Sequence, residues 1–83
     1  MAAPARTLTQ LGAVLRRRRK ALKLSQAELG ARTNLRQATI STLEAGETDT
    51  RLGTVLDVLA ALDLEILVQP RAKTPSAMPG HLF

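Results

Sequence analysis

The stretch LSQAELGARTNLRQATISTLEAGE, Leu24 to Glu47, decides the fold because it carries start and stop signals for two short helices. Ser25 followed three residues later by Glu28 is a capping box, which marks the first turn of a helix. Asn34 tolerates the left-handed backbone conformation that ends a helix, and Gly46 offers the same stop for a second helix. Two helices are therefore predicted on either side of a tight turn at Asn34.

The first of these helices should end near Arg32 or Thr33, and the second should cover about Arg36 to Ala45. Gly30 occupies a position where only a small residue lets two helices cross closely. Aliphatic side chains occupy the positions that must point inward: Leu29, Leu35, Ile40 and Leu43. Two short helices joined in this way form a helix-turn-helix.

Two further apolar patterns with helical spacing flank this unit, so we predict an all-α bundle of about four helices. One helix runs from about Thr9 to Leu22, and its apolar face consists of Leu8, Leu11, Leu15 and Leu22. The other runs from about Arg51 to Leu62, and its apolar face consists of Leu52, Val55, Leu56 and Leu59, widened by Val58 and Leu62. The extra width is suited to contact with a second subunit.

Two charged residues intrude on apolar faces of these helices. Arg19 interrupts the apolar face of the helix predicted for residues 9–22. Glu44 lies beside Ile40 on the inward side of the helix predicted for residues 36–45. Each charge needs a partner, because burying an unpaired charge is costly. We therefore predict a buried or half-buried ion pair between Arg19 and Glu44. The alternative is two independent surface charges.

Residues 64–69, LEILVQ, have the composition of a β-strand that ends before Pro70. No other segment has the pattern of a strand, and a lone strand leaves its backbone donors and acceptors unpaired. We therefore predict that two copies of the chain pair through this segment. The dimer contact would then involve Leu64, Ile66, Leu67 and Val68. The alternative is an irregular segment packed on the last helix.

The prolines mark the limits of the folded part, since all four lie outside residues 5–69. We divide the chain into an N-terminal arm (1–7), a helix-turn-helix domain (8–63), a dimerisation strand (64–69) and a flexible tail (70–83). A single domain of this size has a small core, so stabilisation by a second subunit is consistent with the predicted dimer.

The composition argues against several classes of function. The 83 residues include no cysteine and one histidine, His81, so we expect no enzyme, no metal site and no cofactor. No apolar run approaches the ~18 residues of a membrane span, and the N-terminus does not have the pattern of a secretory signal. We therefore expect a cytoplasmic protein that associates with the bacterial nucleoid through DNA and has no membrane partner.

Charge is divided unevenly along the chain. Residues 1–40 contain nine Lys or Arg and one acidic residue, a net charge of +8, whereas residues 41–83 contain three and six, a net charge of −3. The basic half should attract a polyanion, either nucleic acid or a membrane surface, and a plain solvated surface is the alternative. Phe83 is the only aromatic residue, so there is no platform on which single-stranded bases stack. Duplex DNA is therefore the favoured nucleic acid.

The stretch from Leu24 to Glu47 resembles the helix-turn-helix of the phage-repressor (Xre) class, and the resemblance covers about residues 8–63. Thr33 departs from the pattern of that class, in which an aliphatic residue is expected. The resemblance implies that Gln26, at the start of the first helix of the motif, contacts a DNA phosphate. It also implies that the start of the next helix reads bases, through Arg36, Gln37, Ala38, Ser41 and Thr42.

The side chains of this base-reading set suit the major groove. Gln pairs with adenine through two hydrogen bonds, Ser and Thr bond donor or acceptor edges, and methyl groups meet the thymine methyl. An ordinary polar helix face is the alternative. Phosphate contacts set affinity rather than sequence choice, and we assign them to Gln26, Arg17, Arg32 and Thr48. A two-fold dimer implies an operator with an inverted repeat.

A narrower resemblance is to the HipB-type antitoxins. It rests on RQATIS at residues 36–41, the single strand after the last helix and the short tail. In that group the dimer represses its own operon and binds a HipA-type kinase toxin. The tail would then dock on the toxin with Leu82 and Phe83 as apolar anchor, unless it is a disordered overhang. Two alternatives remain: a plain Xre-class regulator without a toxin, and a module that contacts only proteins.

Overall fold

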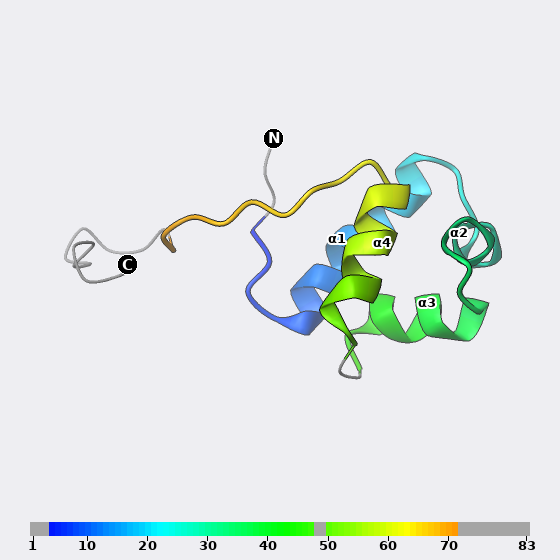
Figure 1. The fold of residues 1–83 in the computed structure, drawn as a ribbon, viewed down its shortest axis with the longest axis horizontal. Helices are drawn as coiled ribbons and strands as arrows, with labels where there is room; N and C mark the ends of the chain where they lie inside the picture. The colour runs from blue at the N-terminus through cyan, green and yellow to red at the C-terminus, as the bar shows by residue number, and fades with distance from the viewer. Residues whose placement is uncertain (1–3, 48–49, 72–83) are drawn as a thin grey trace.

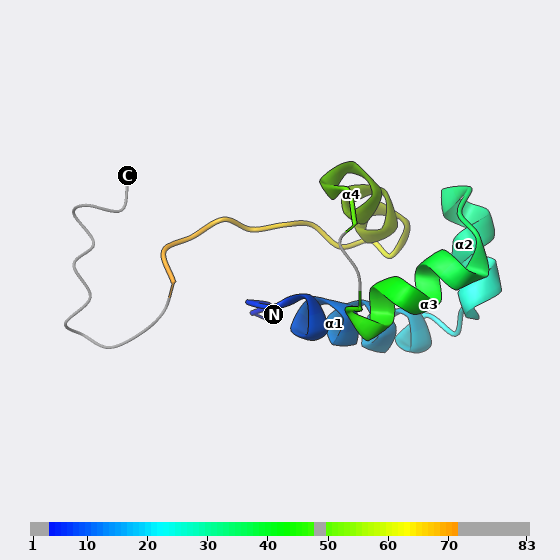
Figure 2. The same ribbon diagram turned by 90° about the horizontal axis from the view of Figure 1, so that it is seen from below.

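The computed structural model describes residues 4–47 and 50–71, and this part of the chain contains four helices. They are α1 (Leu8–Ala21), α2 (Gln26–Thr33), α3 (Gln37–Ala45) and α4 (Leu52–Ala61). Helix α3 packs against both α1 and α2, and α4 packs against α2 (Figures 1 and 2). The predicted all-α helix-turn-helix bundle is confirmed.

The start and stop signals of the motif act as predicted. The Ser25 hydroxyl accepts the backbone N–H of Glu28 at 3.0 Å, and the Glu28 carboxylate accepts the backbone N–H of Ser25 at 2.8 Å. The second of these hydrogen bonds lowers the pKa of Glu28, because it stabilises the ionised carboxylate. Asn34 (φ 60°) and Gly46 (φ 68°) both adopt the left-handed conformation and end α2 and α3.

The predicted helix limits differ from the observed ones at the cap residues. Helix α1 begins at Leu8, because the hydroxyl of Thr7 accepts the backbone N–H of Gln10 at 3.0 Å and caps the helix. Four residues predicted to be helical are caps instead: Leu22, Arg36, Arg51 and Leu62. Cap residues share the hydrogen bonds of the helix without its full geometry, so a sequence pattern does not separate them from helical residues.

The core lies between the helices and contains nine buried aliphatic residues: Leu15, Leu24, Leu29, Ile40, Leu43, Val55, Val58, Leu59 and Leu62. Leu11 and Leu35 pack against it and are partly buried. The predicted apolar face of α1 is wrong at its two ends, since Leu8 and Leu22 are exposed. Leu8 is the first residue of α1 and Leu22 is its cap, so both lie at the margin of the packed region.

Helix α4 turns only part of its predicted apolar face to the core. Val55, Val58, Leu59 and Leu62 are buried, whereas Leu52 is 65% exposed and Leu56 is 44% exposed. The prediction is confirmed for these four buried residues and is wrong for Leu52 and Leu56. Helix α4 has aliphatic residues on most of its sides, so its own sequence pattern does not indicate which side meets the core. The surplus apolar surface of α4 therefore lies at Leu52 and Leu56.

Residues 64–71 leave the end of α4 and extend away from the helices on the side of the N-terminal arm, in neither helix nor strand (Figure 1). Leu64 packs against the core, and its backbone N–H donates to the carbonyl oxygen of Leu59 at 2.8 Å. Ile66, Leu67 and Val68 are exposed, Val68 to 82%. Packing on the last helix therefore extends only to Leu64. The strand was expected to form between two copies of the chain, so it stays a prediction.

Two glycines allow close contacts between helices. A Cβ atom on Gly30 would lie 2.6 Å from the carbonyl oxygen of Leu35, so no side chain fits where α2 meets the turn. This confirms the prediction made for Gly30. A Cβ atom on Gly12 would lie 2.7 Å from the carbonyl oxygen of Leu43. The sequence pattern did not indicate this second close contact, which joins α1 to the backbone of α3.

Candidate nucleic-acid interface

Helix α3 turns one face to the core and the other to the surface. Ile40, Leu43 and Glu44 are buried. Four of the predicted base-reading residues are exposed and Thr42 is half-buried; the exposed ones are Arg36, Gln37, Ala38 and Ser41. Glu44 is the only acidic residue in α3, so the outward face of this helix carries no negative side chain.

Thr42 and Arg36 differ in which of their hydrogen-bonding groups the helix itself uses. The hydroxyl of Thr42 donates to the carbonyl oxygen of Ala38 at 2.9 Å, so its proton is used within the helix while its oxygen still accepts. Arg36 is the N-cap residue of α3, but its side chain makes no capping hydrogen bond. Arg36 therefore projects from the start of α3 with its guanidinium unused by the cap.

Arg19 and Glu44 form the ion pair that the sequence predicted. Arg19 is 7% exposed and Glu44 is 8% exposed. Nε of Arg19 donates to Oε2 of Glu44 at 2.6 Å, and Nη2 donates to Oε1 at 3.0 Å. The hydrogen bond to Glu44 raises the pKa of Arg19 above its ordinary value and outweighs burial, which lowers it. This two-point contact fixes α3 to α1.

The ion pair continues into hydrogen bonds around the start of α2. Nη1 of Arg19 donates to the carbonyl oxygen of Leu24 at 2.8 Å, and Nε2 of Gln26 donates to Oε1 of Glu44 at 3.1 Å. Gln26, the predicted phosphate contact, is half-buried and is the first residue of α2. Its amide group is therefore bonded to the ion pair. Sequence reasoning missed this link, because spacing along the chain gives no sign of it.

Thr33, which departs from the aliphatic pattern of the Xre class, is accommodated by local hydrogen bonds. Its hydroxyl lies 2.9 Å from the carbonyl oxygen of Leu29 and 3.2 Å from that of Gly30. A half-buried hydroxyl that donates to the preceding helical turn leaves no donor unsatisfied. The departure at Thr33 therefore does not disturb the turn between α2 and α3.

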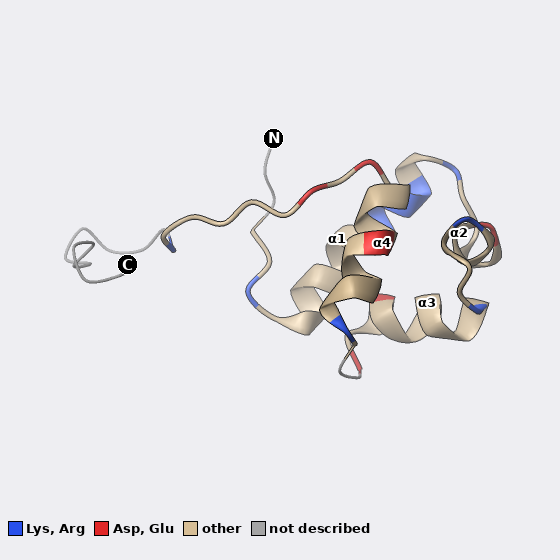
Figure 3. Cartoon of the chain, viewed as in Figure 1, with Lys and Arg blue, Asp and Glu red and all other residues tan. Residues whose placement is uncertain are grey.

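Basic residues follow one another along the C-terminal half of α1, and α2 carries one, Arg32 (Figure 3). Arg17 and Arg32, two of the predicted phosphate contacts, are exposed. Thr48, another of the four predicted phosphate contacts, lies outside the described residues. Arg18 is used within the fold, since its Nε donates to the carbonyl oxygen of Leu62 at 2.9 Å and its Nη2 lies 3.9 Å from the Asp63 carboxylate. Of the arginine run, Arg18 and Arg19 are thus bound internally.

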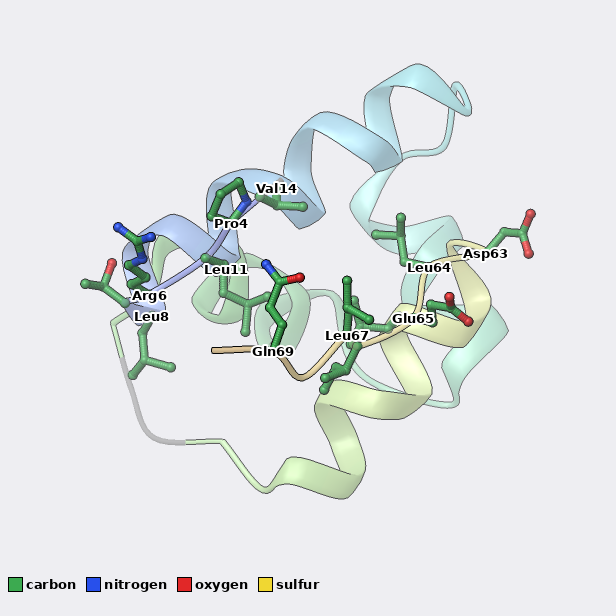
Figure 4. Close-up of a pocket in the computed structure, with 14 residues that line it drawn as sticks. Pro4, Arg6, Leu8, Leu11, Val14, Asp63, Leu64, Glu65, Leu67 and Gln69 are labelled. Carbon is green, nitrogen blue, oxygen red and sulfur yellow. The ribbon is translucent and has the colours of Figure 1, made fainter. Parts of the chain in front are cut away.

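A groove of about 950 Å³ lies between the N-terminal arm, the start of α1 and the segment after α4 (Figure 4). Its lining includes the apolar residues Leu11, Val14, Leu59, Leu64, Ile66 and Leu67. Charged residues from both sides also line it: Arg6, Asp63 and Glu65. Three of the four residues predicted for dimerisation, Leu64, Ile66 and Leu67, therefore border this groove.

The predicted toxin contacts, Leu82 and Phe83, lie outside the described residues. Among residues 4–47 and 50–71, no cluster of three or more His, Cys, Asp or Glu side chains is arranged to hold a metal ion. In the same ranges, no helix combines the length and the apolar character needed to cross a membrane.

Comparison with known proteins decides the family. The family model described as "Helix-turn-helix" matches residues 15–68, which include α2 and α3 in full. The chain belongs to this helix-turn-helix family. The resemblance to the Xre class, inferred from Leu24 to Glu47, is confirmed by this match.

Individual relatives agree with the family. An uncharacterised HTH-type transcriptional regulator, y4dL of Sinorhizobium fredii, is 47% identical over 62 residues, which are 75% of this helix-turn-helix chain and 32% of the relative. The chain thus spans about a third of that protein. A solved complex of HipB with an O2 20mer has a TM-score of 0.79 and 28% identity, covering 87% of this chain and 100% of that chain. A HipA–HipB–O2–O3 complex gives a TM-score of 0.77 and 27% identity, covering 86% of this chain and 100% of that one.

Proposed function

We propose that this helix-turn-helix chain is a sequence-specific, double-stranded DNA-binding transcriptional repressor. The observation that carries the proposal is that the outward face of α3 has no acidic residue. Glu44, the only acidic residue in this helix, is buried in the ion pair with Arg19. Base edges lie between two rows of phosphates, so the phosphates repel an exposed negative charge on a recognition helix unless it accepts a hydrogen bond from a cytosine amino group. Gln37 and Ser41 have the hydrogen-bonding groups for base edges, and Arg36 suits a guanine or a phosphate. Helix α3 is therefore the proposed recognition helix.

Phosphate contacts are proposed for the exposed Arg17 and Arg32, for Gln26 and for Thr48. The arginines have long charged side chains at the surface beside the motif, and each cation that neutralises a phosphate releases counterions from DNA. The affinity should consequently fall steeply between about 50 and 200 mM salt. An affinity that barely changes over this range would contradict phosphate contacts by arginine.

Binding to a duplex from the protein's own promoter, compared with a scrambled duplex, tests the proposal by fluorescence anisotropy. Gln37→Ala should reduce discrimination between the two by about 1–3 kcal/mol. Arg32→Ala should weaken both and lower the salt slope by about 1. Arg71→Ala is the matched control, because it removes an equal charge outside the four helices. Equal affinity of the unmodified protein for both duplexes would refute sequence-specific binding.

A homodimer is the second part of the proposal, and the groove beside α1 supports it. Ile66, Leu67 and Val68 expose apolar surface next to this groove, and the backbone groups of residues 65–69 make no hydrogen bond within the described chain, which leaves them for pairing with a second copy. A two-fold dimer presents two α3 helices to half-sites about 34 Å apart or a multiple of that distance. The operator is therefore proposed to be an inverted repeat.

Analytical ultracentrifugation at micromolar concentration tests the dimer. Leu67→Lys should shift the protein toward monomer, because it places a charge in the proposed interface. Ala31→Lys is the control, since it introduces the same side chain at an exposed position of α2, outside the groove. A stable monomer for the unmodified chain would refute the proposed dimer.

The antitoxin role is proposed on the similarity to the HipA–HipB–O2–O3 complex, together with the RQATIS segment and the tail. The chain would bind and neutralise a HipA-type kinase toxin and repress the operon that encodes both. Deletion of residues 70–83, which include Leu82 and Phe83, should weaken binding of the toxin and leave operator binding intact. Unchanged binding of both would show that the tail is an overhang.

A plain Xre-family regulator without a toxin is the alternative function, and the similarity to the HTH-type transcriptional regulator y4dL favours it. The neighbouring gene separates the two, because a kinase-like reading frame directly downstream is expected only for an antitoxin. Co-purification of that kinase with the chain would then support the antitoxin. A promoter-binding protein with no such neighbour would support the plain regulator.

A further inference from the structure

Glu44 binds two partners that belong to different parts of the molecule. Its carboxylate accepts two hydrogen bonds from Arg19, which holds it to α1, and a third from Nε2 of Gln26 at 3.1 Å. Gln26 is the first residue of α2, and Glu44 lies near the end of α3. The ion pair in the core is thereby connected to the residue for which a phosphate contact is proposed.

This hydrogen bond determines how the Gln26 amide group is oriented. An ionised carboxylate only accepts hydrogen bonds, so Glu44 must face the NH₂ group of Gln26 and not its carbonyl oxygen. Nε2 carries two hydrogens, and Glu44 uses one of them. The second hydrogen and the carbonyl oxygen have no further protein partner among the described residues, and the half-buried side chain leaves them near the surface at the start of α2.

We propose that Glu44 is a positioning residue for the phosphate contact of Gln26. This inference rests on the proposed DNA binding. Glu44 holds the Gln26 amide with one hydrogen directed outward before DNA arrives, so binding does not have to order a flexible side chain. Arg19 is part of the device, because it balances the charge of Glu44 and limits the repulsion between that carboxylate and a nearby phosphate.

The contact made by Gln26 differs in kind from those of the arginines. Gln26 is neutral, so its loss releases no additional counterions and leaves the salt dependence of binding unchanged. Gln26→Ala should weaken operator binding about tenfold at every salt concentration, the effect of one hydrogen bond to a charged group. Loss of Arg32 should instead change the slope, which separates the two kinds of contact.

A double-mutant cycle tests whether Glu44 positions Gln26. Operator affinity is measured for the unmodified protein and for Arg19→Met combined with Glu44→Leu, each with and without Gln26→Ala. The combined substitution removes both charges and every acceptor that holds the Gln26 amide, whereas Glu44→Gln would keep a carbonyl oxygen with two lone pairs that still accepts from it. Gln26→Ala should then cost less than about twofold in the background without the ion pair, against about tenfold in the unmodified one.

Gln37→Ala serves as the control for general damage, since Gln37 is exposed on α3 and makes no hydrogen bond to Glu44. Its loss of affinity should be equal in both backgrounds. If Gln26→Ala costs the same in both backgrounds, the positioning role is refuted while DNA binding stands. If the unmodified protein does not prefer its own promoter, both the proposed function and this inference fail.

A second measurement covers the case in which Arg19→Met combined with Glu44→Leu does not fold. Side-chain amide relaxation by NMR in the unmodified, DNA-free protein compares Gln26 with Gln37. An ordered Gln26 amide beside a mobile Gln37 amide supports positioning by Glu44. Equal mobility of the two amides overturns it, because a positioned donor must be ordered before DNA binds.

Discussion

Removal of Arg19 alone should destabilise the protein severely, since it leaves a buried carboxylate without its countercharge. In Arg19→Met, Glu44 loses the hydrogen bonds at 2.6 and 3.0 Å, and the carbonyl oxygen of Leu24 loses its donor at 2.8 Å. Breaking one side of a buried pair typically costs about 3–5 kcal/mol. Small domains have about 5–15 kcal/mol of total stability, so the variant should be at the limit of folding.

A change of pH within the neutral range cannot remove the charge of Arg19 as the Arg19→Met substitution does. The pKa of Arg19 is raised by its hydrogen bond to Glu44, so its contribution is fully present below the pKa of an unfolded arginine and is lost only as pH rises through the still higher folded value. Arg19 therefore remains charged throughout the neutral range. The chain contains no Trp or Tyr, so unfolding in urea should be followed by far-UV circular dichroism.

Two variants separate charge burial from loss of packing. Arg19→Met combined with Glu44→Leu removes both charges, and its stability should return to within about 2 kcal/mol of the unmodified protein. Arg17→Met is the matched control, since Arg17 is exposed on the same helix, and its effect should stay within about 0.5 kcal/mol. The reasoning is refuted if Arg19→Met costs under about 1 kcal/mol, or if the double variant is no more stable than Arg19→Met.

Three further substitutions test the local features of the motif. Gly30→Ala places a Cβ atom 2.6 Å from the carbonyl oxygen of Leu35, so α2 and the turn must separate, and the midpoint of urea unfolding should fall by an amount equivalent to about 1–3 kcal/mol; an unchanged midpoint would show that the crossing is loose. Ser25→Ala removes the cap of α2 and should cost about 1 kcal/mol in the same assay, whereas Ser41→Ala, on the outward face of α3, should cost much less. The lowered pKa of Glu28 contributes stability above its unfolded value that is lost as pH falls through the folded value, so Glu28→Gln should flatten the acid side of the stability curve, and an identical curve would contradict the capping box.

The features predicted correctly from the sequence are those that local chemistry determines. Ser25 with Glu28 forms a capping box within four residues, and Asn34 and Gly46 stop helices through their own backbone preferences. The ion pair of Arg19 with its partner is a long-range contact, but each charge interrupts an apolar face by itself. Burial then requires that the two meet, so the pattern contains enough information to pair them.

The features that sequence reasoning missed depend on the relative placement of two or more helices. The inward face of α4 cannot be chosen from a helix that is apolar on most sides, and the structure leaves Leu52 and Leu56 outside. The sequence pattern does not distinguish Gly12 from any other small residue in a helix, although Gly12 lies against the backbone of Leu43. Arg18 belongs to a run of four arginines. Its hydrogen bond to the carbonyl oxygen of Leu62 distinguishes it from its neighbours, and this bond depends on where the end of α4 lies relative to α1.

Residues 64–69 differ from these cases, because the missing information lies outside the single chain. A strand needs a second strand for its backbone hydrogen bonds, and the described part of one chain offers none. In the structure, Leu64 is anchored to the core, and Ile66, Leu67 and Val68 are apolar and exposed. Their pairing is consequently a question about two molecules, which a sedimentation experiment answers.

The neutral outward face of α3 follows from the way in which the core uses charge. Glu44 is the only acidic residue in the helix, and Arg19 withdraws it from the surface by a two-point contact. The same contact withdraws Arg19 from the basic surface, so the pair removes one charge of each sign and leaves the surface arginines in excess. Because the pair also holds Gln26, one buried interaction stabilises the fold, keeps negative charge off the outward face of α3 and orients a neutral donor at its edge. Stability and the proposed DNA recognition therefore share Glu44, and a substitution there is expected to affect both.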